Sequence, residues 1–179
     1  MTQQTASDAM IVEASIGRLE VRPAPDGSLR TRWLLPGDDE NAAGRGMPTG
    51  ADAALLDVAD RLRRALAGDE SVRFDDVPTP DGPPAYRACW EACRRIPRGR
   101  TWSYARLASE AGLGPGGARV AGQAMRRNPL PVIIPCHRVV AADGRLHGFA
   151  GSSDDGGAAL ALKAALLRLE AAPIDPLFP

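Results

Sequence analysis

The sequence predicts an α+β fold: a small N-terminal unit with a β-hairpin or sheet, then a helical C-terminal unit that contains a helix-turn-helix. Three observations support this class. β-type stretches are confined to the first 35 residues, helical spacing of apolar residues begins at residue 52, and a proline-rich stretch separates the two patterns. We therefore expect an N-terminal unit over residues 1–76, a linker over 77–84 and a C-terminal unit over 85–179.

The N-terminal unit is expected to begin with β structure. Two β-prone stretches, Ile11–Val21 and Ser28–Leu35, flank Pro25-Asp26-Gly27, a turn signal, and together predict a hairpin. From Asp52 onwards, apolar residues recur at helical spacing, and Gly68 stands where a helix would end. Strands followed by a helix indicate a small α+β unit.

The C-terminal unit is expected to be mostly helical. Its first helix presents one face made of Tyr86, Cys89, Trp90 and Cys93. Ser103 is placed to cap a short second helix through Ala111, and a third helix is predicted over 115–127 after a glycine-containing turn. Two short helices joined in this way are typical of a helix-turn-helix. The third helix is rich in small residues, which allow either close approach to another surface or tight helix packing.

Two further segments complete the C-terminal unit. The apolar run Leu130–Pro135 is bounded by prolines and is too short for a helix, so it predicts a buried extended segment. A last helix is predicted from about Gly157 to Glu170.

The formal net charge of zero conceals an asymmetry along the chain. Residues 1–82 carry 15 acidic residues against 9 arginines, a balance of −6, whereas residues 94–145 carry 10 arginines against 2 acidic residues, a balance of +8. Such a basic half is typical of a protein that binds a polyanion such as nucleic acid. A solvated arginine-rich surface explains the charge alone equally well.

Composition also bears on the cell compartment. The first ten residues are polar and acidic, and no run approaches the roughly 20 apolar residues that a membrane-spanning helix needs. Three cysteines, an odd number, do not indicate a disulfide framework. We therefore expect a cytoplasmic protein that does not bind membranes.

The segment with the strongest chemical signal is Cys136-His137-Arg138, directly after the buried apolar run. A thiol is a nucleophile only as thiolate, so it needs a base or a positive field, which His137 and Arg138 could supply. Neighbouring side chains of an extended segment point to opposite faces, so His137 would reach the thiol only after a turn or through a water. A third group, such as a carboxylate, should fix the imidazole tautomer. The alternative is a small buried hydrophobic cysteine.

Metal chemistry is not expected from the residues present. The two histidines and three cysteines show no paired ligand spacing. A zinc deaminase motif is excluded because Val139 stands where its second cysteine would be. Cys89 and Cys93, four apart on an apolar helix face, are most simply core thiols.

The segment from Asn128 to Val140 closely resembles the active-site segment of the O6-alkylguanine-DNA alkyltransferases, also called methylated-DNA–protein-cysteine methyltransferases. Residues 96–108 and 118–122 resemble the two parts of that family's helix-turn-helix. Residues 148–151 resemble its pocket loop, and residues 162–170 its closing helix. A weaker match extends to the N-terminal unit, so the resemblance covers most of the chain.

The resemblance implies DNA repair by direct reversal. An alkyl group, normally methyl, would pass from O6-alkylguanine that is flipped out of the duplex. Cys136 would accept it irreversibly, in one turnover and without cofactor or metal. His137 would take the thiol proton through a water, and Glu170 would orient His137. Tyr104 would form a hydrogen bond with the guanine ring nitrogen as negative charge develops on the base.

The resemblance also implies how DNA is held. Arg119 would enter the base stack, and Asn128 would brace the turn that holds Cys136. The remaining residues assigned to DNA binding are Ser103, Arg126 and Arg127. The residues assigned to the pocket are Val139, Phe149, Ala150 and Gly151. The expected partner of the monomer is double-stranded DNA with O6-alkylguanine, or O4-alkylthymine as a further candidate lesion, bound in the minor groove.

The chain departs from the family pattern at several places, and other classes of protein fit its residues less well. Phe149 stands where the family commonly has a tyrosine, and Ser153–Ala161 resembles an insertion. The main alternative is an alkyltransferase-like protein that binds lesions without repairing them, but such relatives replace the nucleophile that Cys136 provides. A helix-turn-helix regulator needs no buried Cys-His-Arg segment. A thiol hydrolase would turn over many times and would not need the arginine-rich half.

Overall fold

The computed structural model describes residues 9–38, 52–146, 149 and 157–172. The chain divides into two compact units, Met1–Arg73 and Phe74–Pro179. Among the described residues, the first contains a three-stranded sheet and one helix, and the second contains four α-helices and a short two-stranded sheet. This mixture confirms the predicted α+β class. The more detailed division at 77–84 stays a prediction.

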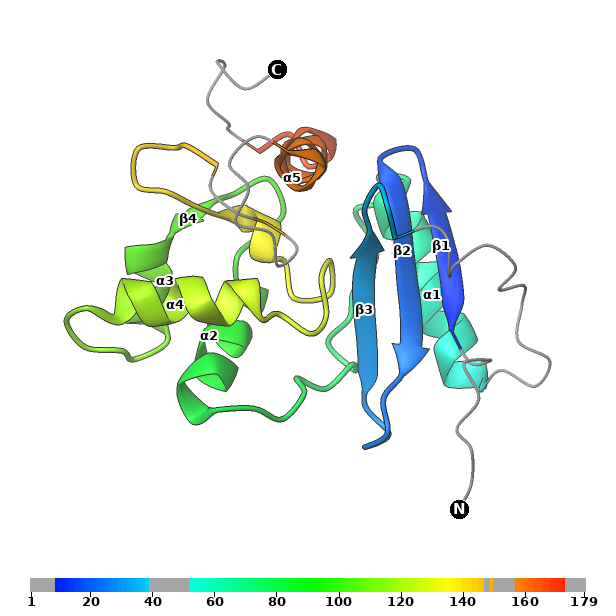
Figure 1. Cartoon of the computed structure of the whole chain (residues 1–179), viewed down its shortest axis with the longest axis horizontal. Coiled ribbons are helices and arrows are strands. Elements are labelled where there is room, and N and C mark those ends of the chain that lie inside the picture. Colours follow the sequence, from blue (N-terminus) through cyan, green and yellow to red (C-terminus); the bar gives the residue numbers. More distant parts are fainter. Residues whose placement is uncertain (1–8, 39–51, 147–148, 150–156, 173–179) are drawn as a thin grey trace. The chain divides into compact units, whose positions relative to one another are not determined.

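The N-terminal unit contains an antiparallel sheet with the strand order β1-β2-β3 (Figure 1). Its strands are β1 (Met10–Ala14), β2 (Gly17–Pro23) and β3 (Leu29–Leu34). Side chains alternate between the faces of a strand, and the register aligns Leu19 with Val12 on one side and with Trp33 on the other. All three are buried and form the core face of the sheet.

The stretch Ile11–Val21 is β structure as predicted, but it forms two strands instead of one, because the chain reverses within it. A turn at Ser15-Ile16 separates β1 from β2. Ser15 is the weaker kind of turn former and Ile16 is β-prone, so the β propensity of the stretch hid the reversal, which Gly17 permits with φ 147°. The turn predicted at Pro25-Asp26-Gly27 is confirmed: Gly27 has φ 77°, and the Asp26 carboxylate accepts a backbone hydrogen bond of 2.9 Å within the turn.

Helix α1 (Ala53–Leu66) packs against β1 and β2 and covers the apolar side of the sheet. Its N-cap is Asp52, whose carboxylate accepts a hydrogen bond of 3.2 Å from the backbone of Ala54. The buried side recurs at helical spacing and consists of Leu55, Val58, Ala59, Leu62 and Leu66. Gly68 follows the helix end with φ 96°, so both predicted ends of this helix are confirmed.

The helices of the C-terminal unit occupy the predicted positions. They are α2 (Pro84–Arg94), α3 (Tyr104–Glu110), α4 (Gly117–Arg126) and α5 (Ala158–Leu169). Helix α2 begins at Pro84, within the predicted linker, because the missing N–H of proline costs nothing at the first helical position. Cys89, Trp90 and Cys93 are buried on one face of α2, as predicted.

Helices α3 and α4 pack closely and form the predicted helix-turn-helix. The Ser103 hydroxyl caps α3 by accepting a hydrogen bond of 3.1 Å from the backbone N–H of Arg106. At Gly117, a Cβ atom would lie 2.7 Å from Cβ of Leu113 and 3.1 Å from Cβ of Ala108. Glycine is therefore needed at position 117 for close helix packing. Of the two explanations offered for the small residues, approach to another surface or tight helix packing, the second applies at this position.

A short parallel pair of strands positions the next segment. Strand β4 (Trp102–Ser103) pairs with β5 (Val139–Val140), and Trp102 lies opposite Val139. Strand β4 leads directly into α3, while β5 directly follows the 3-10 turn η2 (Cys136–Arg138). The pairing therefore brings the first residue of α3, Tyr104, towards the Cys136 turn.

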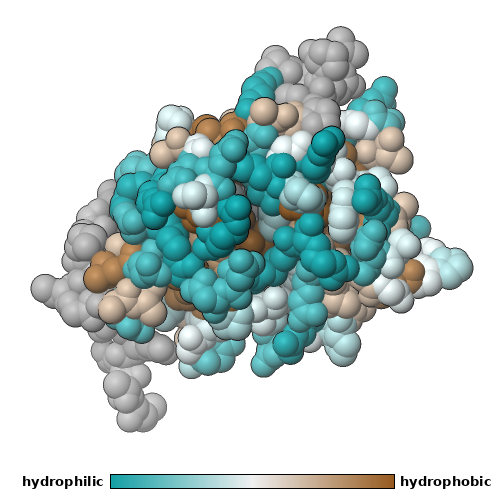
Figure 2. Space-filling model, turned by 180° about the vertical axis from the view of Figure 1, so that it is seen from behind, coloured by the Kyte–Doolittle hydropathy of each residue, from teal (hydrophilic) through white to brown (hydrophobic). Residues whose placement is uncertain are grey.

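Within the described ranges, no helix is long and apolar enough to cross a membrane. Figure 2 shows that hydrophilic residues predominate on the face seen from behind, where hydrophobic residues reach the surface only in small patches.

Candidate active site

The segment that precedes the cysteine folds back on itself. The predicted extended conformation of Leu130–Pro135 is wrong: the backbone N–H of Ile134 donates to the carbonyl of Leu130 at 2.8 Å, and Val132 has φ 77°. The Asn128 amide braces this turn, because its Nδ2 donates to the Ile134 carbonyl at 2.8 Å and its Oδ1 accepts from the Leu130 N–H at 2.9 Å. Prolines at both ends of the turn lack the N–H that a strand ladder requires.

Cys136 begins the turn η2 instead of continuing an extended chain. Its N–H donates to the Ile134 carbonyl at 2.8 Å, and the N–H of Arg138 donates to the Pro135 carbonyl at 2.9 Å. Successive residues of a 3-10 turn are about 120° apart, so Cys136 and His137 do not point to opposite faces as an extended segment would require. Both side chains are buried.

The resting Cys136 thiol is not pre-ionised. Burial raises its pKa above the ordinary value of 9.0, although a hydrogen bond from the Asn128 side chain, the charge of Lys163 and nearby backbone N–H groups lower it. The thiol is therefore mostly protonated at neutral pH and needs a base to become a nucleophile.

His137 follows Cys136 on the same turn, and its side chain is only 1% exposed. Its Nε2 lies 3.1 Å from Oε1 of Glu170, but the ring N–H is not aligned for a full hydrogen bond, so the contact is a close electrostatic one. Its Nδ1 is buried and forms no hydrogen bond with the described residues. Burial lowers the pKa of His137, and Arg138 and Lys163 lower it further against the opposing effect of Glu170. The imidazole is therefore neutral at neutral pH.

Glu170 is the C-cap residue of α5 and is buried. Arg138 donates to both carboxylate oxygens, from Nε to Oε2 and from Nη2 to Oε1, each at 2.8 Å. Burial alone would raise the pKa of Glu170, but the interactions with His137 and Arg138 hold it well below the usual range. The carboxylate is therefore ionised and fixed against the imidazole.

The sequence suggested that Arg138 could supply a positive field to the Cys136 thiol. In the structure, its guanidinium binds other groups instead. Besides Glu170, its Nη1 donates to the backbone carbonyl of Ile96 at 2.6 Å. The guanidinium thus joins the Cys136 turn to the end of α5 and to the chain segment after α2. In the sequence, Arg138 is 32 residues from Glu170 and 42 residues from Ile96, so no local pattern indicates these hydrogen bonds.

Tyr104 and Lys163 lie close to each other beside the strand that follows the Cys136 turn. Lys163, on α5, is 1% exposed, and its Nζ donates to the Val139 carbonyl at 2.7 Å and lies 6.0 Å from the centroid of the Tyr104 ring. Burial raises the pKa of Tyr104 to about 12, and interactions with Cys136 and Cys93 add to this. Lys163 was missed among the predicted site residues. The signal that could have identified it is that Lys163 is the only lysine in the sequence and stands within an apolar helix.

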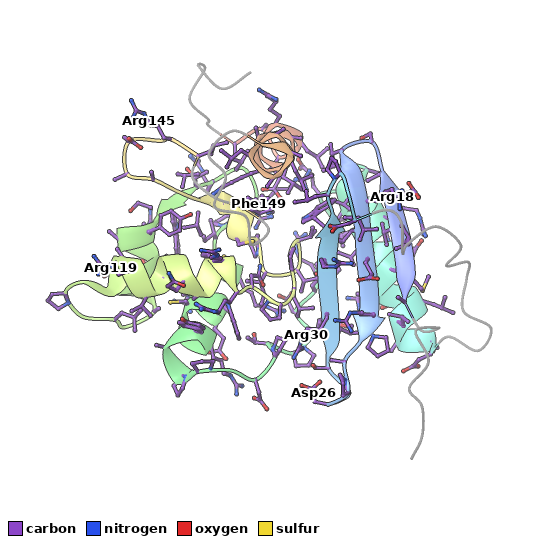
Figure 3. All side chains as sticks on the ribbon, viewed as in Figure 1. Arg18, Asp26, Arg30, Arg119, Arg145 and Phe149 are labelled. Carbon is purple, nitrogen blue, oxygen red and sulfur yellow. The ribbon has the colours of Figure 1, made fainter. Side chains whose placement is uncertain are left out.

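Three of the five residues assigned to DNA, Arg119, Arg126 and Arg127, lie on α4 or at its end. Arg119 and Arg126 are exposed, and their side chains make no hydrogen bond or ion pair with the part of the chain that the structure describes. Arg119 lies near the beginning of the helix (Figure 3). Arg127 is held in place, because its Nη1 donates to the Tyr86 hydroxyl at 3.0 Å and to the Gln123 side chain at 2.6 Å.

Of the residues assigned to the pocket, Val139 and Phe149 are buried (Figure 3 labels Phe149). Ala150 and Gly151 lie outside the described residues, as do residues 153–156 of the expected insertion. Its last residues, 158–161, form the first turn of α5. The structure therefore brings Cys136, His137 and Glu170 into one cluster, with Tyr104 close to Cys136, while Arg119 stands at the surface.

Known proteins match both the sequence and the fold. The family described as 6-O-methylguanine DNA methyltransferase, DNA binding domain, matches residues 84–172. The methylated-DNA–protein-cysteine methyltransferase of Shigella flexneri is 40% identical over 95 residues, which cover 52% of this chain and 54% of that protein. The match thus spans about half the length of that curated relative.

Solved structures match over nearly the whole chain. The crystal structure of the Mycobacterium tuberculosis O6-methylguanine methyltransferase superimposes with a TM-score of 0.70 and 32% identity, and covers 96% of this chain and 99% of that one. A crystal structure of the M. tuberculosis OGT in complex with DNA gives a TM-score of 0.68 and 30% identity, with 93% and 95% covered.

Proposed function

The chain belongs to the family of the methylated-DNA–protein-cysteine methyltransferases, and we propose that it repairs DNA by moving an alkyl group from O6-alkylguanine to its own Cys136. The observation that carries this proposal is the buried cluster of Cys136, His137 and Glu170. In it, Nε2 of His137 faces a fixed carboxylate, and Nδ1 has no partner among the described residues. The DNA complex of the M. tuberculosis relative supports DNA as the partner.

The first chemical step is activation of the thiol. Glu170 lies beside Nε2 of His137 and favours the tautomer that carries its proton there. The lone pair of Nδ1 is then available to take the Cys136 proton through a bridging water. Because the pKa of His137 is lowered, the imidazole is unprotonated before the step begins. Cys136 becomes the thiolate, and His137 carries the proton.

The second step is alkyl transfer. The thiolate sulfur attacks the alkyl carbon, so an S–C bond forms while the bond between that carbon and O6 of guanine breaks. The electron pair of the broken bond stays on the base, where a hydrogen bond from the Tyr104 hydroxyl to a ring nitrogen offsets the developing charge. The product on Cys136 is a thioether, a poor electrophile, and the described residues of the site place no ionised thiol beside it, because burial raises the pKa of Cys93. Each molecule therefore acts once.

Access to the damaged base requires that it leave the stack, because the sulfur must approach the alkyl carbon in line. Arg119 is exposed and unpaired among the described residues, so it is available to fill the gap left by the flipped nucleotide. We assign the helix-turn-helix to the minor groove, whose degenerate code suits a protein that scans for damage. Arg126, Arg127 and the exposed side of α4 would contact phosphates.

The substrate is accordingly double-stranded DNA with O6-alkylguanine, with O4-alkylthymine as a second candidate, bound by one protein monomer. All three cysteines are free and buried. A reactive thiol of this kind persists in a reducing compartment, which favours the cytoplasm.

The proposal is tested by titrating a duplex oligonucleotide that carries one O6-methylguanine with increasing protein and measuring the lesion that remains. We expect one lesion to disappear for each protein molecule, followed by a plateau. Cys136→Ala should bind the duplex with similar affinity and remove no lesion. Repeated turnover would contradict the single-use mechanism, and binding without repair by the wild type would favour the lesion-sensing alternative.

A further inference from the structure

The Glu170 carboxylate is shared unequally between two neighbours on the same turn. Arg138 makes two aligned hydrogen bonds of 2.8 Å to it, whereas His137 makes one contact of 3.1 Å that is not aligned. Oε1 takes part in both interactions. Arg98 lies farther away, with its Nη1 4.0 Å from the same oxygen. The carboxylate therefore has a two-point contact with Arg138 and a single, longer contact with the imidazole.

This unequal sharing matters because a carboxylate has two effects on a histidine. It fixes the tautomer, which a general base needs, but it also stabilises the imidazolium, which cannot accept a proton. A buried Glu170 with no other partner would favour the imidazolium. Arg138 is positively charged, so it offsets much of the stabilisation that Glu170 gives to the imidazolium. The effect of Glu170 on the imidazole tautomer remains.

The other charged groups around His137 act in the same direction. Lys163, on α5, is a second cation that disfavours the imidazolium. Arg98, in the segment after α2, adds positive charge near Glu170, and its Nη2 donates to the Leu169 carbonyl at 3.1 Å. Cys136, on the same turn, is uncharged until it reacts. Glu170 is thus the one acidic group that the described part of the cluster contributes.

We propose that Arg138 is a positioning residue for the base: it binds both oxygens of Glu170, holds that carboxylate beside Nε2 of His137, and keeps the imidazole uncharged. Its third hydrogen bond, to the Ile96 carbonyl, fixes the guanidinium while it does so. This inference rests on the proposed function for the role of His137, although the protonation state itself can be measured without substrate.

The experiment compares the titration of His137 in the wild type, Arg138→Met and Arg138→Lys by NMR of the imidazole resonances, without DNA. The chain has two histidines, so His147→Gln identifies the signals of His137. Arg95→Met is the matched control, because it removes an exposed arginine whose Nη2 donates to the Glu110 carbonyl. Thermal unfolding of each variant verifies that it folds.

Removal of the guanidinium should raise the proton affinity of His137 in Arg138→Met by about ten-fold or more. Arg138→Lys keeps the charge but not the two-point contact, so its titration should lie between those of Arg138→Met and the wild type. Arg95→Met should match the wild type. In transfer assays, the acidic part of the pH–rate profile of each variant should move to higher pH by as much as the His137 titration of that variant moves.

A His137 titration in Arg138→Met that stays within two-fold of the wild type would overturn the inference and leave Arg138 a purely structural contact. If Arg138→Met does not fold, Arg138→Lys decides: a raised proton affinity supports the inference and an unchanged one overturns it. The titration needs no substrate. A failure of methyl transfer to Cys136 would therefore count against the proposed function and would leave this measurement interpretable.

Discussion

The α-carbon of Gly99 faces the backbone carbonyl of Glu170 so closely that a Cβ atom at Gly99 would lie 3.0 Å from its oxygen. Gly99 also has φ 72°, a conformation that glycine adopts most readily. The turn after α2 thus packs directly on Glu170, the residue that we propose orients His137. A side chain at position 99 should move the end of α5 and, with it, the carboxylate.

Gly99→Ala should therefore reduce both stability and the rate of methyl transfer. Gly112→Ala is a close control, because Gly112 has φ 71° and a Cβ atom there would meet nothing within 4 Å. Each substitution should cost about 1–2 kcal/mol for its backbone conformation. Denaturant unfolding should show a larger loss for Gly99→Ala, and that variant alone should repair slowly. Equal stability losses and equal repair rates would mean that the contact has no effect on the site.

Lys163→Met should make the protein more stable at neutral pH. Burial lowers the pKa of Lys163 from 10.5 to about 8, which corresponds to a cost on the order of 3 kcal/mol for the charged form. Methionine has a similar length and carries no charge. The gain is partly offset by the lost hydrogen bond to the Val139 carbonyl, about 1 kcal/mol. A net gain of roughly 2 kcal/mol is expected in denaturant unfolding at pH 7.

The pH dependence of that gain is a sharper measurement. The folded pKa of Lys163 lies below its unfolded value, so the cost is fully present below about pH 8 and disappears as the pH rises towards 10.5. The difference in stability between Lys163→Met and the wild type should narrow over this window. The variant should nevertheless transfer methyl groups more slowly, because the ammonium lowers the pKa of Cys136. A difference in stability that does not change with pH would contradict this account of Lys163.

Glu170→Gln and His137→Gln should differ in severity. Loss of the base should reduce transfer near pH 7 by about 10²-fold or more, and loss of the carboxylate by a smaller factor. Both should recover part of their activity at alkaline pH, because the thiol, whose pKa lies above 9.0, then ionises without help. Glu91→Gln, on the exposed side of α2, is the control. A silent Glu170→Gln with a damaged His137→Gln would keep the mechanism and remove Glu170 from it.

Arg119→Ala should slow repair of duplex DNA far more than reaction with the free base O6-methylguanine. Unstacking a base costs a few kcal/mol, which a side chain in the vacated space helps to offset, and a free base has no stack to leave. A loss of about ten-fold or more on duplex alone is expected from single-turnover rates. Arg126→Ala, on the same helix, should instead weaken binding in a salt-dependent way. Equal losses on both substrates would exclude the proposed role of Arg119.

Much of the fold could be predicted because its signals are local. Asp52, Ser103 and Gly68 mark helix ends through their own backbone hydrogen bonds or conformations, and the structure confirms each of them. The reversal at Ser15-Ile16 and the turn within Leu130–Pro135 were missed. In both, β-prone or apolar residues dominate, and the chain direction depends on Gly17, Asn128 and the packing around them.

The candidate site, too, could be predicted only in part. Cys136 and His137 stand out in the sequence because they are adjacent, and the family resemblance supplies Glu170 and Tyr104. The contact of Arg138 with Glu170 joins residues 32 apart, and that of Lys163 with the Val139 carbonyl joins residues 24 apart. Neither pair of residues has a spacing in the sequence that would indicate contact, because both contacts depend on how α5 packs against the Cys136 turn.

The most direct test of the central claim is the intact mass of the protein, followed by peptide mapping, after incubation with duplex DNA that carries O6-methylguanine. We expect each reacted molecule to gain the mass of one methyl group, and the modified peptide to place that group on Cys136. The same treatment should leave Cys136→Ala unchanged in mass. A methyl group on Cys89 or Cys93, or loss of the lesion without any gain in protein mass, would contradict the account.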